Sequence, residues 1–205
     1  RYDAAVAVLR EAVALRPGYA LGYNNLGHAL AAAGDPAGAL EAFTGAVAAE
    51  PSSIVALIGL GQANADLRRF DAARDCLQRV LVLEPGSLAA LTNLAAAEYG
   101  DGDLRTAAAC YEQVLAAAPH DRDAAVQLAV CYAQLGRCAD FHAMAERAIA
   151  CAPEDRETRS ILLFSFGLDP DVSPARAFAA HRDFGALLPA RPAPVRAPHA
   201  PIRVG

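Results

Sequence analysis

The chain has 205 residues, of which 55% are hydrophobic and 20% are charged, a composition that excludes a disordered protein. Residues 1–169 carry 13 Arg against 21 Asp and Glu, a net charge of −8, whereas residues 170–205 carry +3. An acidic body argues against binding to nucleic-acid phosphates, and the small basic tail is interpreted as a solvated linker. No apolar run reaches the roughly 18–20 uncharged residues that span a bilayer. We therefore expect neither a nucleic acid nor a membrane as partner.

A proline recurs at a constant interval along the chain and marks the end of a predicted helix each time. These prolines are Pro17, Pro51, Pro85, Pro119 and Pro153. A proline at this place removes a backbone donor and stops the helix. Good helix N-caps follow shortly after four of them, at Ser53, Ser87, Asp121 and Asp155.

The same period holds inside the predicted helices. In the first helix of each pair a leucine recurs, at Leu26, Leu60, Leu94, Leu128 and Leu162. A small residue follows the first four of these, at Gly27, Gly61, Ala95 and Ala129, which allows two helices to approach closely. In the second helix an alanine precedes a large residue by one turn, in the pairs Ala5–Leu9, Ala39–Phe43, Ala73–Leu77 and Ala107–Tyr111.

The fifth cycle reverses this order, with Phe141 at the small position and Ala145 at the large one. The exchange roughly keeps the total volume, and we expect the two helices of this repeat to splay locally. The alternative is that a terminal repeat is under less packing constraint. Turns within the repeats are predicted at Gly34, Gly102 and Gly136, with Asp35 and Asp103 as caps. The stretch from Gly100 to Asp103 lacks the spacing of a calcium loop and is interpreted as such a turn.

This pattern resembles the tetratricopeptide repeat, a helix-turn-helix unit of about 34 residues. The resemblance implies an all-α fold, a right-handed superhelical solenoid of antiparallel helix pairs. We expect a half repeat at 1–17 and full repeats at 20–53, 54–87, 88–121 and 122–155, followed by a helical adaptor at 156–188 and a Pro-rich linker at 189–205.

The resemblance also implies a concave groove lined by one face of each first helix, which binds a protein or peptide. The candidate groove residues are Asn24, Asn25, His28, Gln62, Thr92, Asn93 and Gln127, with Ile58, Gly59, Ala96, Val126 and Val130 between them. Amides suit the backbone of an extended peptide because they both donate and accept hydrogen bonds. The alternative is that these Asn and Gln residues are ordinary solvent-facing positions. A lysine-rich clamp for chaperone tails is excluded, since the chain has no lysine.

Beyond Leu162 the period fails. An apolar helix, a turn at Asp169–Asp171 and a helix opened by Ser173 and Pro174 are predicted, and then a stretch with five prolines ends in PIRVG. This order resembles the junction in bacterial homologues of protein O-GlcNAc transferase, whose catalytic domain follows at this point. That resemblance implies a longer protein that moves N-acetylglucosamine from UDP-GlcNAc to Ser or Thr hydroxyls of proteins. Asn25 and Asn93 would belong to a partial asparagine ladder that holds the acceptor.

The chain itself shows no catalytic or metal-ligand constellation and implies no cofactor of its own. His181, beside Arg182 and Phe184, is interpreted as a packing residue. Five scattered cysteines without a CxxC pattern fit reduced thiols in a cytoplasmic protein. Two functions are left open: the acceptor-binding region of such a transferase, and a non-enzymatic adaptor that mediates protein–protein interaction.

Overall fold

The structure is a computed structural model that describes residues 2–168 and 172–186. These residues form eleven α-helices, and the prediction of an all-α array of antiparallel helix pairs is confirmed. The helices are α1 (Tyr2–Leu15), α2 (Ala20–Ala32), α3 (Pro36–Ala49), α4 (Ile54–Asp66), α5 (Phe70–Leu83), α6 (Leu88–Asp101), α7 (Leu104–Ala117), α8 (Arg122–Gln134), α9 (Cys138–Cys151), α10 (Arg156–Leu168) and α11 (Pro174–Ala186).

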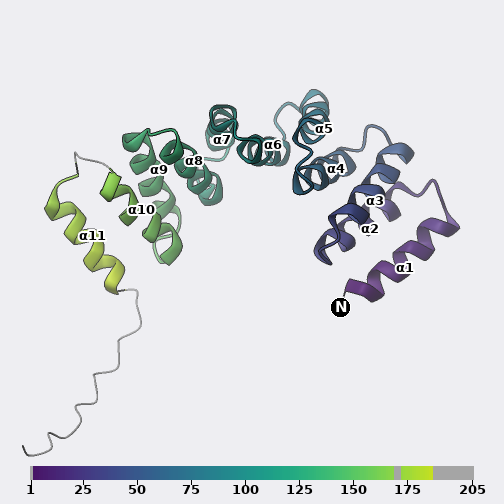
Figure 1. Cartoon of the computed structure of the whole chain (residues 1–205), viewed down its shortest axis with the longest axis horizontal. Helices are drawn as coiled ribbons and strands as arrows, with labels where there is room; N and C mark the ends of the chain where they lie inside the picture. The colour runs from purple at the N-terminus through teal and green to yellow at the C-terminus, as the bar shows by residue number, and fades with distance from the viewer. Residues whose placement is uncertain (1, 169–171, 187–205) are drawn as a thin grey trace, which may run out of the picture.

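Consecutive helices follow one another along an arc from α1 to α11 (Figure 1), and each packs against the next. Helices α4 and α6 lie toward the inside of the arc, whereas α5 and α7 lie on its outside. Helix α4 also contacts α2 and α6 directly. The first helices of successive pairs begin at Ala20, Ile54, Leu88, Arg122 and Arg156, so the spacing of the repeats is constant through α10.

The recurring prolines lie in identical tight turns between pairs. Each of α1, α3, α5, α7 and α9 ends two residues before its proline. In each turn a backbone N–H donates to the carbonyl three residues earlier, for example Ser53 to Glu50 at 3.1 Å and Asp121 to Ala118 at 3.1 Å. Proline is favoured at the second position of such a turn because its φ is already set.

The predicted N-caps divide by residue type. Asp121 accepts a hydrogen bond from the Ala124 N–H at 2.9 Å, and Asp155 accepts one from the Thr158 N–H at 2.9 Å. Ser53 and Ser87 stand at the N-cap positions of α4 and α6, but their side chains make no capping hydrogen bond. The expectation that these two serines cap through their side chains is therefore wrong.

The turns within repeats share a left-handed residue at the same repeat position. Gly34, Gly102 and Gly136 have φ values of 81°, 96° and 71°, and the equivalent residue in the second full repeat is Arg68, with φ of 57°. The next residue always donates to a carbonyl five positions back, as Arg69 N–H does to Asn64 at 2.8 Å. This is the helix ending that favours glycine. Arg68 therefore adopts a left-handed backbone conformation that is unfavourable for a residue with a side chain.

Small and large residues face one another where the sequence predicts. A Cβ added at Gly27 would lie 2.7 Å from Phe43 Cε1, and one at Gly61 would lie 2.8 Å from Leu77 Cγ. In the fifth cycle Phe141 and Ala145 are both buried, and the Phe141 ring centroid lies 6.3 Å from that of Phe164 on α10. Phe141 therefore fills core space, and the local splay remains a prediction.

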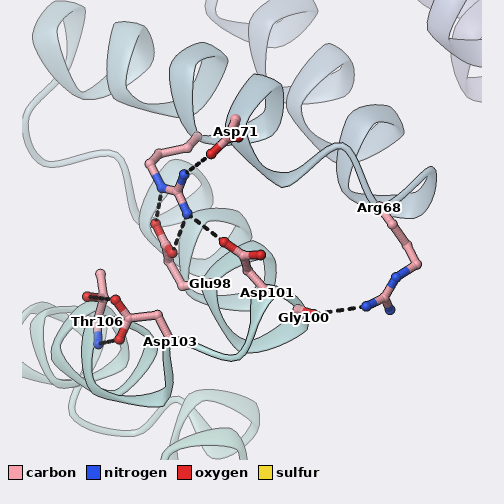
Figure 2. Close-up of polar contacts among 8 residues, drawn as sticks. Arg68, Asp71, Glu98, Gly100, Asp101, Asp103 and Thr106 are labelled. Atoms are coloured by element: carbon pink, nitrogen blue, oxygen red, sulfur yellow. Dashed lines mark hydrogen bonds and ion pairs between the residues drawn. The ribbon is translucent and has the colours of Figure 1, made fainter.

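A charged cluster connects the repeats across α5 and α6 (Figure 2). The Arg74 guanidinium donates through Nε to Glu98 Oε1 at 2.7 Å and through Nη2 to Glu98 Oε2 at 2.8 Å. It also contacts Asp71 at 2.7 Å and Asp101 at 3.1 Å. The Glu98 carboxylate raises the pKa of Arg74, although burial opposes this. The buried glutamate is thus neutralised by the preceding repeat.

Candidate functional site

Figure 1 places the first helices α4 and α6 toward the inside of the arc, and we call the exposed face that recurs on each first helix the inner surface. The second residue of each first helix is exposed, and its character changes along the array. These residues are Leu21, Val55, Ala89, Asp123 and Glu157. At this repeat position the side chains thus change from apolar at the N-terminal end to acidic at the C-terminal end.

One hollow of about 460 Å³ lies between α4 and α6, and we call it the central hollow. It brings together Gln62 and Asn93 of the predicted groove, with Asp66, Arg68, Phe70 and Ala96 around them. Asn93 Nδ2 donates to the Ala89 carbonyl at 2.8 Å, which leaves its Oδ1 as an acceptor. The Arg68 guanidinium lies 5.1 Å from the centroid of the Phe70 ring. The hollow thus combines amides, one balanced pair of charges and an aromatic wall.

Four further predicted residues are exposed on the same helix faces: Asn25, His28, Thr92 and Gln127. The His28 ring packs edge-on against Phe43 with centroids 5.0 Å apart. Gln127 lines a smaller hollow with Arg122, Asp123 and Glu157.

Asn24 differs from the other predicted residues. It is only 9% exposed, and its Oδ1 has no hydrogen-bond partner among the described residues. Asn24 therefore offers a ligand much less surface than the exposed Asn25, and its assignment to the groove stays a prediction. The sequence does not separate Asn24 from Asn25, because a shift of one residue decides burial on a helix.

The gap in the asparagine ladder at Gly59 has a packing cause. Gly59 is buried, and a Cβ added there would lie 2.4 Å from Phe43 Cε1. The ring of Phe43 thus lies between Gly27 of its own repeat and Gly59 of the next. The position equivalent to Asn25 and Asn93 is therefore occupied by core packing in this repeat.

A second hollow, of about 500 Å³, lies between α8 and α10, and we call it the C-terminal hollow. Its lining residues include Val130, Gln134, Phe141, Glu157, Ile161 and Phe164. The predicted groove ends at Val130 and does not include the α10 residues. The signal was present, since Glu157, Ile161 and Phe164 lie one full repeat after Asp123, Gln127 and Val130.

A cross-repeat contact joins α6 and α8 at the C-terminal hollow, whose lining includes Gln134. Gln134 Nε2 on α8 donates to the Tyr99 hydroxyl on α6. A separate bond joins α8 to α7: the Tyr132 hydroxyl donates to Glu112 Oε1 at 2.5 Å, and burial together with this bond raises the pKa of Tyr132 to about 12. The phenol therefore stays protonated and acts as a structural donor.

Buried His142 belongs to the packing of α9 against α10. Its Nδ1 lies 3.0 Å from Ser165 Oγ, and its ring lies 4.8 Å from that of Phe166. Ser165 Oγ donates to the Leu162 carbonyl at 2.6 Å, so the histidine supplies the proton for its own bond to Ser165. His181 is exposed on α11. Neither histidine lies in one of the two hollows.

None of the helices within residues 2–168 and 172–186 combines the length and the apolar character needed to cross a membrane.

Paired helices with a fixed repeat spacing and an inner face of mixed character define a helical repeat protein. The chain belongs to the tetratricopeptide repeat family, one of whose models matches residues 30–98 and 98–162. A second model of the same description matches residues 1–54.

Similar solved structures cover most of the chain. A crystal structure of MamA has a TM-score of 0.68 and 20% identity, and the match covers 79% of this chain and 94% of that one. MamA from Desulfovibrio magneticus RS-1, from residue 41 to its end, has a TM-score of 0.69 and 23% identity, and the match covers 82% of this chain and 92% of that one. A chain of the APC/C hetero-tetramer Cut9–Hcn1 has a TM-score of 0.70 and 15% identity, and the match covers 93% of this chain and 38% of that one. No curated protein matches the chain. At these identities the likeness concerns the fold.

Proposed function

We propose that this chain is a protein-interaction module that binds an extended polypeptide along its inner surface, in the manner of an adaptor. The observation that carries the proposal is the central hollow, where Gln62 and Asn93 from two successive first helices line one depression. Side-chain amides at this spacing can pair with the N–H and C=O groups of an extended backbone. Binding by backbone pairing tolerates many sequences, which suits an adaptor.

The family supports this proposal in general terms, because tetratricopeptide repeats bind proteins or peptides. Among the similar structures, Cut9 is found in a hetero-tetramer with Hcn1. The partner of the present chain is proposed from its own surface alone.

A second candidate function is that the array presents acceptor proteins to a glycosyltransferase domain. The observation that favours it is α11, which begins at Pro174 with the Ser173 hydroxyl accepting from the Arg176 N–H at 3.3 Å, as the junction sequence predicts. The turn at 169–171 and the Pro-rich stretch at 189–205 lie outside the described residues. We favour the adaptor, because it rests on the residues that line the central hollow and needs no further domain.

The test begins with selection of twelve-residue peptides from a random displayed library against the whole chain. Selected peptides are then titrated against the wild type and the double variant Gln62→Ala/Asn93→Ala. We expect at least tenfold weaker binding by this variant, because both amides contact the peptide. The matched control is Gln78→Ala/Gln113→Ala, which removes two exposed glutamines from α5 and α7 and should change affinity less than twofold. Equal losses in both double variants would contradict the proposal.

A further inference from the structure

We propose that the C-terminal hollow binds a large apolar side chain, aromatic above all, of a partner polypeptide that carries basic residues beside it. This inference rests on the proposed function and names the chemistry of the partner at one end of the inner surface.

The floor of the hollow is apolar and its wall is an exposed aromatic ring. Phe141 is only 2% exposed and belongs to the core, whereas Phe164 on α10 is 64% exposed. Their ring centroids lie 6.3 Å apart at a tilt of 56°, a geometry typical of interacting aromatic pairs. Val130 and Ile161 complete the apolar lining. A volume of about 500 Å³ leaves room for a large side chain against these surfaces.

The polar rim of the hollow is acidic. Glu157 lies in both the C-terminal hollow and the smaller hollow beside it, which also contains Asp123 and Asp155. The single arginine there, Arg122, pairs with Asp123 at 2.6 Å and with Asp155 at 2.9 Å. One guanidinium against three carboxylates leaves a net charge of −2 among the residues that line these two hollows. The central hollow, by contrast, contains one acid and one base, Asp66 and Arg68.

These charges select one class of occupant. The negative electrostatic potential of the hollow attracts a basic segment and repels an acidic one, whereas the apolar floor alone would accept any apolar side chain. A second copy of the repeat array is disfavoured, since residues 1–169 carry a net charge of −8. The geometry therefore points to a separate polypeptide with an aromatic residue followed closely by arginine or lysine.

The test uses capped, fluorescein-labelled ten-residue peptides of glycine and serine as probes. The first probe carries one phenylalanine and, two and three residues later, two arginines. The second replaces the phenylalanine by alanine, and the third replaces both arginines by glutamates. With the full chain at low salt, we expect the first probe to bind at least tenfold more tightly than either of the others.

Two protein variants locate the probe. Phe164→Ala should reduce the preference for phenylalanine over alanine to within threefold, and Glu157→Arg should make the glutamate probe bind better than the arginine probe. The matched control Phe178→Ala removes another exposed phenylalanine, 72% exposed on α11, and should change nothing. Circular dichroism checks that each variant is folded.

Specific results would overturn the inference. Absence of binding by the first probe, or unchanged preferences in Phe164→Ala and Glu157→Arg, would do so. If the triple variant Arg191→Ser/Arg196→Ser/Arg203→Ser bound the first probe tenfold more tightly, the occupant would be the basic tail of the chain itself, and assignment to a separate partner would be wrong. The proposed function is tested separately, by the affinity of library-selected peptides for the wild type and for the Gln62→Ala/Asn93→Ala variant.

Discussion

The ring of Phe43 occupies the space that a side chain at position 59 would need, with only 2.4 Å between Phe43 Cε1 and a Cβ built on Gly59. This relationship joins the core of one repeat to the inner surface of the next. It explains why the amide ladder of the inner surface is interrupted, because the same position cannot both contact a ligand and accommodate the ring.

Gly59→Asn, which would complete the ladder in sequence, should therefore weaken the protein. Overpacking of a core by a few atoms costs about 1–3 kcal/mol, and we expect a loss of unfolding free energy in that range. Urea unfolding followed by circular dichroism measures it. Ala96→Asn, at an exposed position of α6, is the control and should change stability by less than about 0.5 kcal/mol. A Gly59→Asn protein as stable as the control would show that the ring moves aside freely.

Removal of the Arg74 guanidinium should destabilise the junction between α5 and α6. Glu98 has a side chain only 5% exposed and would lose its bidentate partner. Such a loss costs about 2 kcal/mol, and Arg74→Ala should lower the unfolding free energy by this amount. The double variant Arg74→Ala/Glu98→Ala should recover part of the loss, since no unpaired carboxylate remains. The exposed Arg105 provides the control substitution to alanine. Additive effects of the two single changes would contradict the pairing.

Substitutions at Arg68 and at Gly102 should affect stability differently: a side chain added at Gly102 should destabilise the protein, whereas removal of the side chain at Arg68 should not. Both have positive φ at equivalent turns, 57° and 96°. Because a side chain costs roughly 1–2 kcal/mol in this conformation, Gly102→Ala should destabilise by about 1 kcal/mol. Arg68→Gly should be neutral or stabilising, since relief of the left-handed backbone offsets the loss of the contact with Phe70. Thermal unfolding compares them, and a clearly destabilised Arg68→Gly would show that the contacts of the guanidinium outweigh the strain.

Stability should fall at alkaline pH because buried thiols and phenols resist ionisation. Burial raises the pKa of Cys131 to about 11, that of Tyr111 to about 12, and that of Cys110 upward as well. A group whose pKa is higher in the folded state than in the unfolded state stabilises the fold fully at pH values below its unfolded pKa, which is about 8.5 for a thiol. This stabilisation is lost as the pH rises through the folded pKa, about 11 for Cys131. The unfolding free energy should therefore decrease between pH 8 and pH 10.5.

The alanine variant of Cys131 isolates one part of this effect. Cys131→Ala should show a shallower decrease over the same pH range, whereas Cys138→Ala, at a partly exposed position, should keep the wild-type slope. Identical slopes in all three proteins would assign the pH dependence to other groups.

Much of the fold could be predicted because the repeat period is carried by residues with direct backbone effects. Proline at the turns and small residues at the close contacts restrict conformation locally, and the structure shows both. Arg68 could not be placed in a left-handed turn from its identity, since arginine disfavours that conformation. Its position, one full repeat after Gly34, was the available signal.

The candidate site was harder to predict, because burial on a helix changes from one residue to the next. Asn24 and Asn25 look equivalent in sequence, yet only Asn25 is exposed. The C-terminal hollow was missed because its wall, Phe164, comes from a helix that was assigned to the adaptor. Packing between repeats determines which side chains remain accessible, and a single repeat does not contain that information.

The central claim, that a polypeptide binds the inside of the arc, is tested most directly by site-specific photo-crosslinking. A benzophenone amino acid is placed at Thr92 on α6 or at Gln113 on α7, both exposed, and irradiated with a library-selected peptide. We predict a crosslinked adduct from position 92 and none from position 113. Crosslinking from position 113, with none from position 92, would contradict the account.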